Sequence, residues 1–553
     1  MVWGVMRLKI SYICVCAWAL VTPSPLCLGD GEELPIAHEQ PPVSPWIPAP
    51  RPTSSTNGDC RSHVIRDGFV STQVNVDRFG CNIPGDAANE SSIAVSATDP
   101  RKMVIGWRQF DTVGSSFRQA GYGYSHDAGH TWVFPGILNP GEFRSDPVLD
   151  SGPDGTVYFF SPRLDGPTVL FRTYDGGSTW AAPSQANPGL VDKPWMAVDR
   201  TNGIGRGNIY IADEGRFFQS SDGGDSFDQY HQSFNGYPTL AVAPDGVVYV
   251  ASPYSDVSKS INAQNPDDEP TFEYLGFVSR DWGSGQFGAE PNPGGLFGQT
   301  WVATDHSNGP TRGNVYLFAS VLVFGDDPLD VRFTRSTNGG MTWSEPIRVN
   351  DDPLDNGAHQ WFGMMSVAPN GRIDVAWNDT RNSGQATLSE LFYSYSTDAG
   401  DSWSKNIPVS PMFDSHVGWP AGQTKIGDYY HMVSDNLGVN VAYAATFNGE
   451  QDIYFLRIGP WDCNGNETDD ALDISELRSR DCNVNEVPDE CEYRVDINGD
   501  GLTTLADFAT FQLNLTGPGI PIAADCTGLL DPDHDGDIDL HDFYLFQHVY
   551  LKP

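Results

Sequence analysis

The sequence predicts an all-β protein, a seven-bladed β-propeller, followed by a small, mainly α-helical calcium-binding module at the C-terminus. The first observation is a turn motif that occurs six times, with successive copies 47 to 60 residues apart. A repeat at this period indicates similar units stacked side by side. The second is composition, because 58 glycines and 41 prolines in 553 residues suit a chain with many tight turns. The third is a pair of acidic, glycine-containing loops near the C-terminus, which differ in kind from the repeats.

The six copies of the turn motif share the pattern Ser/Thr-x-Asp/Asn-x-Gly-x-Thr/Ser-aromatic. They are SHDAGHTW (125–132), TYDGGSTW (173–180), SSDGGDSF (220–227), SRDWGSGQF (279–287), STNGGMTW (336–343) and STDAGDSW (396–403). An aspartate side chain accepts hydrogen bonds from nearby backbone amides, and glycine supplies a positive φ at no steric cost. We therefore expect a structural role for the third-position residues Asp127, Asp175, Asp222, Asp281, Asn338 and Asp398.

Each repeat unit begins with an apolar strand, and seven such starts occur near residues 91, 146, 194, 238, 300, 361 and 427. The last unit has three strands and no turn motif. Its missing fourth strand is assigned to STQVNVD (71–77), which resembles the strand EPIRVND (345–351) that follows a turn motif. An N-terminal strand in the last blade would close the ring and remove its open edges. The propeller is predicted to cover residues 62–459.

The turn motif resembles the Asp-box, or BNR repeat, of sialidase-like β-propellers. Sialidases usually have six blades, so a six-bladed ring is the alternative. The resemblance implies extracellular glycans or glycoproteins as partners. For a glycoside hydrolase of the exo-sialidase type, it also implies three arginines that bind a substrate carboxylate and a tyrosine nucleophile.

The resemblance assigns these roles to five residues. Arg381 ends the strand GRIDVAWNDTR (371–381) and matches a clamp arginine, and Arg108 and Arg163 would complete the clamp by topology. Tyr429 and Tyr430, in the last blade, match the place of the nucleophile.

One motif of the sialidase family is missing from this chain. The family's Arg-Ile-Pro motif is replaced by Asn82-Ile83-Pro84, with asparagine in the place of the arginine. Two functions therefore stay open. One is a glycosidase, and the other is a non-catalytic propeller that binds glycans or proteins for adhesion or surface assembly.

In a four-stranded antiparallel blade, the first strand starts and the second strand ends on one face, opposite the turn motifs. Ligands are expected on this face, where the first strands converge. The first-strand starts carry Glu90, Asp146, Asp192, Lys193, Trp195, Tyr237, Trp301, His359, Gln360, Trp361, Asp428, Tyr429 and Tyr430, and the second-strand ends carry Arg108, Arg163, Asp213, Glu214, Arg216, Asp379 and Arg381. Aromatic faces stack on sugar rings, and the charged side chains can bind hydroxyl groups.

The C-terminal region divides into two kinds of acidic segment. The near-duplicates DCNGNETDDALD (462–473) and DCNVNEVPDECE (481–492) resemble thrombospondin type-3-like calcium repeats, and they define a Cys-containing region over 460–495. The loops DINGDGLTTLAD (496–507) and DPDHDGDIDLHD (531–542) have the spacing of EF-hand calcium loops.

Both EF-hand-like loops lead into the same helical signature, DFATFQ (507–512) and DFYLFQ (542–547), so residues 496–553 resemble a type I dockerin. The resemblance implies a cohesin-like protein partner and Ca²⁺ as the bound ion. The predicted calcium ligands are Asp496, Asn498, Asp500, Leu502, Thr504, Asp507, Asp531, Asp533, Asp535, Asp537, Asp539 and Asp542.

The N-terminus predicts secretion or display at the cell surface. Arg7 and Lys9 precede an apolar stretch over 10–21, and small residues lie before Asp30, so residues 1–29 are predicted to be a signal peptide. A Pro- and Ser-rich linker follows over 30–61. No other stretch is predicted to span a membrane. The net charge of −40 argues against binding to nucleic acid.

Removal of the signal peptide would leave six cysteines in an oxidising compartment. Cys60 and Cys81 are expected to pair with each other. The four cysteines of the tail allow three pairings, and the sequence does not choose among them.

Overall fold

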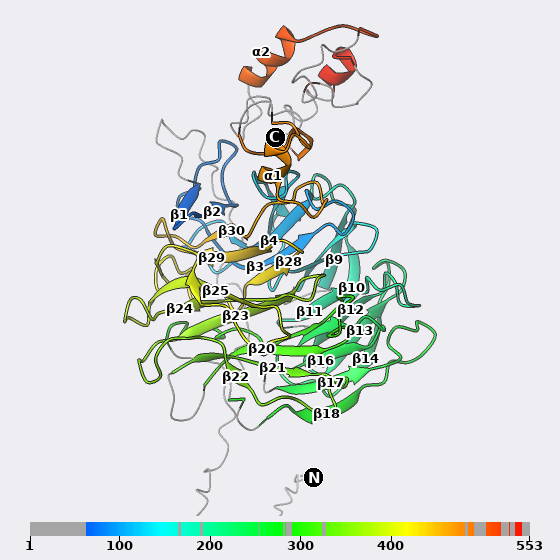
Figure 1. Cartoon of the computed structure of the whole chain (residues 1–553), viewed down its shortest axis with the longest axis vertical. Coiled ribbons are helices and arrows are strands. Elements are labelled where there is room, and N and C mark those ends of the chain that lie inside the picture. Colours follow the sequence, from blue (N-terminus) through cyan, green and yellow to red (C-terminus); the bar gives the residue numbers. More distant parts are fainter. Residues whose placement is uncertain are drawn as a thin grey trace, which may run out of the picture. The chain divides into compact units, whose positions relative to one another are not determined.

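The structure of the protein is a computed structural model. It describes residues 62–163, 168–187, 192–253, 255–279, 282–283, 290–322, 328–481, 485–491, 505–520, 530 and 537–544. The strands of the described residues form seven antiparallel sheets. Figure 1 shows these sheets in chain order, from the blue and cyan β3 and β4 to the yellow β28.

The first four blades each contain four strands. Blade 1 has β3 (Ala87–Val95), β4 (Met103–Phe110), β5 (Gln119–Ser125) and β6 (Val133–Leu138). Blade 2 has β7 (Val148–Ser151), β8 (Val157–Ser161), β9 (Thr168–Thr173) and β10 (Ser184–Asn187). Blade 3 has β11 (Trp195–Val198), β12 (Ile209–Asp213), β13 (Arg216–Ser220) and β14 (Asp228–His231). Blade 4 has β15 (Thr239–Val242), β16 (Val248–Ala251), β17 (Asp256–Ser260) and β18 (Glu273–Phe277).

The last three blades depart from this plan at their outer strands. Blade 5 has β19 (Trp301–Thr304), β20 (Val315–Val321), β21 (Asp330–Ser336) and the short β22 (Ile347–Arg348). Blade 6 has β23 (Gln360–Val367), β24 (Ile373–Asp379), β25 (Leu388–Ser396) and β26 (Ile407–Pro408), and β27 (Phe413–Asp414) also pairs with β25. Blade 7 has β28 (His431–Ser434), β29 (Val439–Ala445), β30 (Asp452–Ile458), β2 (Phe69–Gln73) and β1 (His63–Arg66).

The first strands of the seven blades form a closed ring. Each of β3, β7, β11, β15, β19 and β23 contacts the first strand of the next blade, and β28 contacts β3. Middle strands such as β8 and β24 are buried at every residue because neighbouring blades cover both of their faces. The prediction of a seven-bladed propeller is confirmed, and the six-bladed alternative is wrong.

The N-terminal strand of the propeller completes the last blade. β2 pairs antiparallel with β30, with Ser71 opposite Leu456 and Gln73 opposite Tyr454. The contact continues past the strand, because the Asn75 carboxamide donates a hydrogen bond of 2.6 Å to Asp452. The predicted closing segment 71–77 therefore occupies the expected place, and β1 adds a fifth strand outside it.

The turn motifs use their third-position residue to close the turn. Asp175 accepts hydrogen bonds of 2.9 Å from the Thr173 hydroxyl, 2.8 Å from the Thr179 amide and 2.6 Å from the Thr179 hydroxyl. These bonds lower the pKa of Asp175, although burial opposes the shift. The arrangement recurs at Asp127, Asp222, Asn338 and Asp398, and Asp281 lies outside the described residues.

The described tail consists of short helical segments joined by turns. It contains α1 (Asp470–Ser475), the 3₁₀ turn η1 (Asp489–Cys491), α2 (Leu505–Leu513) and a helical segment over 540–544. The Phe508 and Phe543 rings lie 5.4 Å apart, so the two helical segments of the predicted EF-hand pair are in contact.

In the described part of the tail, Cys463 and Cys491 form a disulfide. Cys81 is disulfide-bonded, and its predicted partner Cys60 lies outside the described residues, as do the predicted signal peptide and linker. Among the described residues, no helix has the length and apolar character that crossing a membrane requires.

Candidate functional site

The first strands of all seven blades start on one face of the propeller, which we call the strand-start face. At this face each blade contributes one buried residue at an equivalent position, two residues before the regular part of its first strand. This strand-start ring consists of Glu90, Asp146, Lys193, Tyr237, Gln299, Phe362 and Tyr429. In β3 and β23 the ring residue lies in a β-bulge, so these two strands extend beyond it.

Four members of the strand-start ring have a left-handed backbone although none is glycine. The φ angles are 54° at Glu90, 42° at Asp146, 46° at Lys193 and 53° at Phe362. Such conformations cost about 1–3 kcal/mol each, and they concentrate where a protein needs a side chain in one fixed direction. The ring is therefore a strained and specific feature of this face.

Charged side chains form a buried network beside the ring. The Arg108 Nε atom lies 3.0 Å from Glu90, and Lys425 Nζ lies 2.6 Å from Asp428. Lys193 Nζ lies 3.4 Å from Asp428 and links the network to blade 3. Burial raises the pKa of Glu90 well above its ordinary value. Burial also acts to raise the pKa of Asp428, but Lys425, Lys193 and Arg108 lower it overall.

Two connecting segments cover part of this network. The Asn292 carboxamide donates 2.9 Å to the Gly427 carbonyl and accepts from the Ile426 amide at 3.0 Å. The Leu296 amide donates 2.8 Å to Asp428. Residues 290–299 join blade 4 to blade 5, whereas residues 424–428 lead into blade 7, so the contact crosses the strand-start face. We call this contact the cap, and it explains why Asp428 and Glu90 are fully buried.

Beside the cap, on blade 3, lies a group of charged residues that reaches solvent. This rim cluster consists of Asp192, Lys193, Asp213, Glu214 and Arg216. The side chains of Asp192 and Arg216 are 26% and 22% exposed.

Two ion pairs hold four members of the rim cluster. The Arg216 guanidinium binds both Asp213 oxygens, at 3.1 and 2.6 Å. Lys193 Nζ binds Asp192 at 3.0 Å and lies 4.7 Å from the centre of the Tyr237 ring. Burial raises the pKa of Asp213 to about 7, and burial also raises the pKa of Asp192. The cluster thus exposes part of the Asp192 carboxylate and of the Arg216 guanidinium to a polar ligand, with Lys193 and Asp213 buried behind them.

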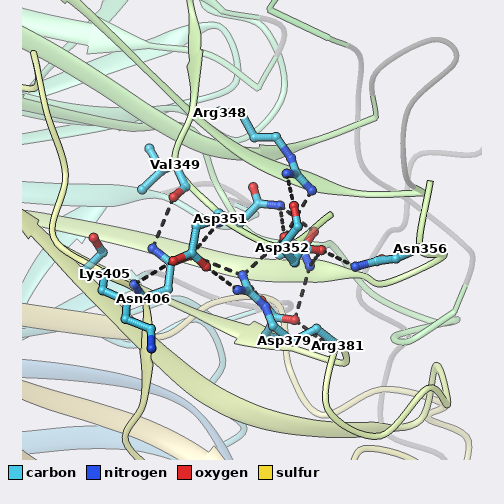
Figure 2. Close-up of polar contacts among 12 residues, drawn as sticks. Arg348, Val349, Asp351, Asp352, Asn356, Asp379, Arg381, Lys405 and Asn406 are labelled. Carbon is cyan, nitrogen blue, oxygen red and sulfur yellow. Dashed lines mark hydrogen bonds and ion pairs between the residues drawn. The ribbon is translucent and has the colours of Figure 1, made fainter. Parts of the chain in front are cut away.

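Arg381 lies elsewhere, in a network between blades 5 and 6 (Figure 2). Its guanidinium binds Asp351 at 2.6 Å, Asp379 at 2.9 Å and Asp352 at 3.3 Å. Figure 2 shows Arg348 on the far side of Asp352, which it also binds. Arg381 therefore joins the end of β24 to the segment that follows β22.

The structure does not bring the three predicted clamp arginines to one point. Arg108 is fully buried in blade 1, where it binds Glu90. Arg163 binds Glu142 at 2.5 Å, and Arg381 belongs to the network between blades 5 and 6. Because each guanidinium already binds a different carboxylate, the three do not form a shared anion site.

The two predicted nucleophiles are buried as well. The Tyr429 hydroxyl donates 2.9 Å to the Pro147 carbonyl, and the Tyr430 hydroxyl donates 2.6 Å to the Ala444 carbonyl. Both side chains are 1% exposed. Neither hydroxyl donates to a carboxylate that could activate it, so the sialidase arrangement of tyrosine and glutamate is not formed by these residues.

The sequence placed the rim cluster and most of the strand-start ring on this face, but it missed four contributors, which are Lys425, Asn292, Gln299 and Phe362. Lys425, Asn292 and Gln299 come from connections between blades, where no strand pattern marks them. Lys425 follows a Gly-Gln-Thr tripeptide that reads as an ordinary loop. The one sequence signal that could have pointed to Lys425 is its place three residues before the segment Asp428-Tyr429-Tyr430.

Three of the described calcium ligands lie together at the end of the second EF-hand-like loop. Carboxylate oxygens of Asp537, Asp539 and Asp542 lie within 4.8 Å of one another, as hard oxygen ligands for a cation would. Asp507 is buried in α2. The other predicted ligands lie outside the described residues: Asp496, Asn498, Asp500, Leu502, Thr504, Asp531, Asp533 and Asp535.

No family model matches the sequence. No curated protein matches it either.

Solved structures resemble the chain only weakly. A protein of unknown function from Dyadobacter fermentans has a TM-score of 0.37 at 12% identity, over 72% of this chain and 99% of its own. An α-L-arabinofuranosidase from Fusarium graminearum has a TM-score of 0.35 at 12% identity, over 72% and 98%. The endosialidase of phage phi92 has a TM-score of 0.41 at 10% identity, over 71% and 69%. At these scores the likenesses carry no argument about function.

Proposed function

We propose that this protein is an extracellular, glycan-binding β-propeller that holds its ligand at the rim cluster of the strand-start face. The observation that carries the proposal is the Asp213–Arg216 pair beside Asp192 and Lys193, partly open to solvent next to the buried strand-start ring. Carboxylates and cations held in fixed directions can bind the hydroxyl groups of a sugar from several sides. The buried Tyr237 ring lies against Lys193 and helps to hold it in place.

Binding is preferred to sialoside hydrolysis because the catalytic groups of that reaction are not assembled. Arg108 and Arg381 bind carboxylates of the protein, and the Tyr429 and Tyr430 hydroxyls bind backbone carbonyls. A substrate carboxylate would have to displace an existing ion pair at each arginine. Secretion through the predicted signal peptide and a cohesin-like partner for the tail remain predictions.

One observation favours a second function, glycoside hydrolysis at the rim cluster itself. Burial raises the pKa of Asp213 to about 7, and the Asp192 charge adds to this shift. A carboxyl group with such a pKa can serve as a general acid while a second carboxylate acts as base or nucleophile. Asp192 and Asp213 would take these two roles.

A glycan array with the full chain and two arginine variants tests the binding proposal. Arg216→Ala should lose at least about tenfold in affinity, because an unpaired buried Asp213 would replace a charge-assisted pair. The matched control is Arg335→Ala, since Arg335 also binds one aspartate, Asp401, but beside the turn motifs. Equal loss in the two variants, or no binding of any glycan by the wild type, would reject the proposal.

Hydrolysis is tested separately with a panel of fluorogenic glycosides. Turnover that Asp213→Asn abolishes, with retained glycan binding, would establish the second function. Turnover that survives in Asp213→Asn but not in Tyr430→Phe would return the catalytic role to Tyr430. No turnover by the wild type leaves binding as the function.

We also propose that the tail binds Ca²⁺. The closely spaced oxygens of Asp537, Asp539 and Asp542 support this, because carboxylates at such distances repel one another unless a cation lies between them. Isothermal titration of the metal-free chain with CaCl₂ should give saturable binding. Absence of any heat or mass signal for calcium would refute this part of the proposal.

A further inference from the structure

The segment that follows β30, which the sequence assigned to the acidic Cys-containing region over 460–495, packs against the propeller. The Trp461 ring stacks on the His130 ring at 3.9 Å and lies 6.3 Å from the Phe455 ring. His130 belongs to the turn motif of blade 1, and Phe455 belongs to β30 of blade 7. Trp461 therefore contacts both blades at the junction where the ring closes.

Two polar contacts fasten the same segment to the same two blades. The Arg101 guanidinium, in the loop between β3 and β4, donates 2.8 Å to the Glu490 carbonyl. The Asn436 carboxamide, in the loop between β28 and β29, donates 2.8 Å to Glu467. The disulfide between Cys463 and Cys491 joins the two ends of the segment. We call the described residues 461–481 and 485–491 the clasp.

The first acidic repeat, residues 462–473, folds as a tight loop within the clasp. Asp462 accepts hydrogen bonds from the Asn466 and Glu467 amides at 3.0 and 2.9 Å. Glu467 has a φ of 65° at the sixth position, where EF-hand loops place glycine for the sharp turn. The second repeat forms the same two bonds at Asp481.

A separate observation indicates that this loop takes a cation. Asp473, at the twelfth position, is fully buried, and its Oδ1 atom accepts no hydrogen bond among the described residues. The nearest positive group is the half-exposed Arg478, at 3.6 Å. The other oxygen, Oδ2, accepts 2.6 Å from the Asn466 carboxamide, which places Asn466 beside it. A buried carboxylate oxygen with no hydrogen bond and only a long ion pair to a half-exposed guanidinium is poorly compensated, and a bound cation would supply the missing charge.

The donor set suits calcium. Asp462, Asn464, Asn466 and Asp473 supply side-chain oxygens at the first, third, fifth and twelfth positions, and hard oxygen ligands are those that Ca²⁺ prefers. Asp470, at the ninth position, accepts from the Cys463 amide at 3.1 Å, and Asp462, Asn464 and Asn466 likewise accept from backbone amides within the loop. The Cys463, Asp470 and Cys491 group is occupied by the disulfide and is not a metal site.

We propose that a calcium ion in loop 462–473 locks the clasp across the junction of blades 1 and 7, so that calcium stabilises the propeller ring itself. The ion fixes the loop that carries Glu467, and the disulfide ties that loop to the Glu490 end of the clasp. A small cavity of about 70 Å³, lined by Val95, Met103, Val433 and Trp461 among others, lies at the same junction. Loosening the clasp would open this junction to water.

This inference rests on calcium binding by the tail, and the experiment separates the two claims. Three variants of the full chain are compared with the wild type: Asp473→Asn, Trp461→Ala and Asp542→Asn. Asp542→Asn is the matched control, because it removes the same charge from the same loop position of an EF-hand-like loop outside the clasp. Calcium stoichiometry is measured by isothermal titration. Propeller unfolding is followed by tryptophan fluorescence, because the sequence after Trp461 contains no tryptophan.

Chelation should lower the propeller unfolding midpoint of the wild type by roughly 2–6 °C. Asp473→Asn should bind one calcium fewer and unfold at the lower midpoint even with calcium present. Trp461→Ala should bind the wild-type number of calcium ions, yet its propeller midpoint should no longer respond to chelation. Asp542→Asn should bind one calcium fewer and keep the wild-type propeller midpoint.

Each other outcome identifies the claim that fails. Normal stoichiometry in Asp473→Asn would overturn the site in loop 462–473. Loss of one calcium from Asp473→Asn without a change in propeller midpoint would overturn the clasp while calcium binding stands. An equal fall in the propeller midpoint for Asp473→Asn and Asp542→Asn would also overturn the clasp, because loss of calcium anywhere in the tail would then have the same effect. A wild type that binds no calcium would refute both claims together.

Discussion

Arg108 and Glu90 form an ion pair of 3.0 Å in which both side chains are 0% exposed. They come from adjacent strands of blade 1, and Arg108 also donates 2.8 Å to Asn89, its partner in the β3–β4 ladder. The guanidinium is therefore committed to a carboxylate of its own blade. Its role in this arrangement is to neutralise a charge buried at the centre of the propeller.

Removing this guanidinium should destabilise the fold. We expect Arg108→Ala to lower the free energy of unfolding by about 3 kcal/mol, because it leaves a buried carboxyl group without its partner. The loss stays near the lower end of the usual range, since burial already raises the pKa of Glu90 and favours its protonation. Urea unfolding measures the change. Arg163→Ala is the control, because its partly exposed pair with Glu142 should be worth about 0–1 kcal/mol. Equal losses would contradict the buried role.

Tyr430→Phe should change stability and leave binding intact. The variant removes one hydrogen bond, the 2.6 Å contact with the Ala444 carbonyl, and should cost about 1 kcal/mol. Glycan affinity should remain within about twofold of the wild type, because the hydroxyl does not reach solvent. Thermal unfolding and the glycan array provide the two measurements. A large fall in affinity with unchanged stability would show that Tyr430 contacts the ligand.

The aspartates of the turn motifs predict how the stability of the fold changes at acidic pH. Hydrogen bonds lower the pKa of Asp175 in the folded state although burial opposes them, so this carboxylate stabilises the fold above the unfolded pKa of about 4. That contribution is lost as the pH falls through the lower, folded pKa. Asp175→Asn should abolish this part of the acid sensitivity at a cost below about 1 kcal/mol. Asn338 already makes the corresponding bonds in another copy. Unfolding midpoints at pH 6 and pH 3 provide the test.

The raised pKa of Asp213 predicts that the stability of the fold changes with pH between about 4 and 7, in the direction opposite to the contribution of Asp175. Burial raises its folded pKa to about 7, so between pH 4 and 7 the folded state keeps a proton that the unfolded state has released. Stability should therefore fall as the pH rises through this range and level off above it. Asp213→Asn should flatten this part of the curve. Denaturant unfolding of the wild type and of Asp213→Asn at pH 5, 6, 7 and 8 gives two curves of stability against pH. If the two curves are parallel, Asp213 ionises normally.

The number of blades and the face of the candidate site could be predicted because both follow from repetition. Six turn motifs and seven strand starts set the number of blades, and the antiparallel order of each blade then assigns residues such as Asp213 and Arg216 to one face. The closing strand could also be predicted, since residues 71–77 resemble a strand that follows a turn motif.

The cap and the clasp could not be predicted from the sequence. Asn292 reaches Gly427 across the ring, and Trp461 reaches His130 from beyond the last strand. Such contacts depend on how connecting segments fold in space, and no periodicity marks them. The cap and the packing within blade 7 bury Tyr429 and Tyr430. Their position in the sequence suggested accessible side chains because it does not show either contact.

The pairing of β2 with β30 also bears on the order in which the protein is made. Ser71 and Leu456 are joined in one ladder, yet nearly four hundred residues separate them. Synthesis proceeds from the N-terminus, so β2 must wait without its partner until the last strand has left the ribosome. Pairing over so long a loop is slow, and it leaves a bare sheet edge during the delay. The ring can therefore close only after almost the whole propeller has been made, and a chain cut short in its seventh blade would expose an edge to its neighbours.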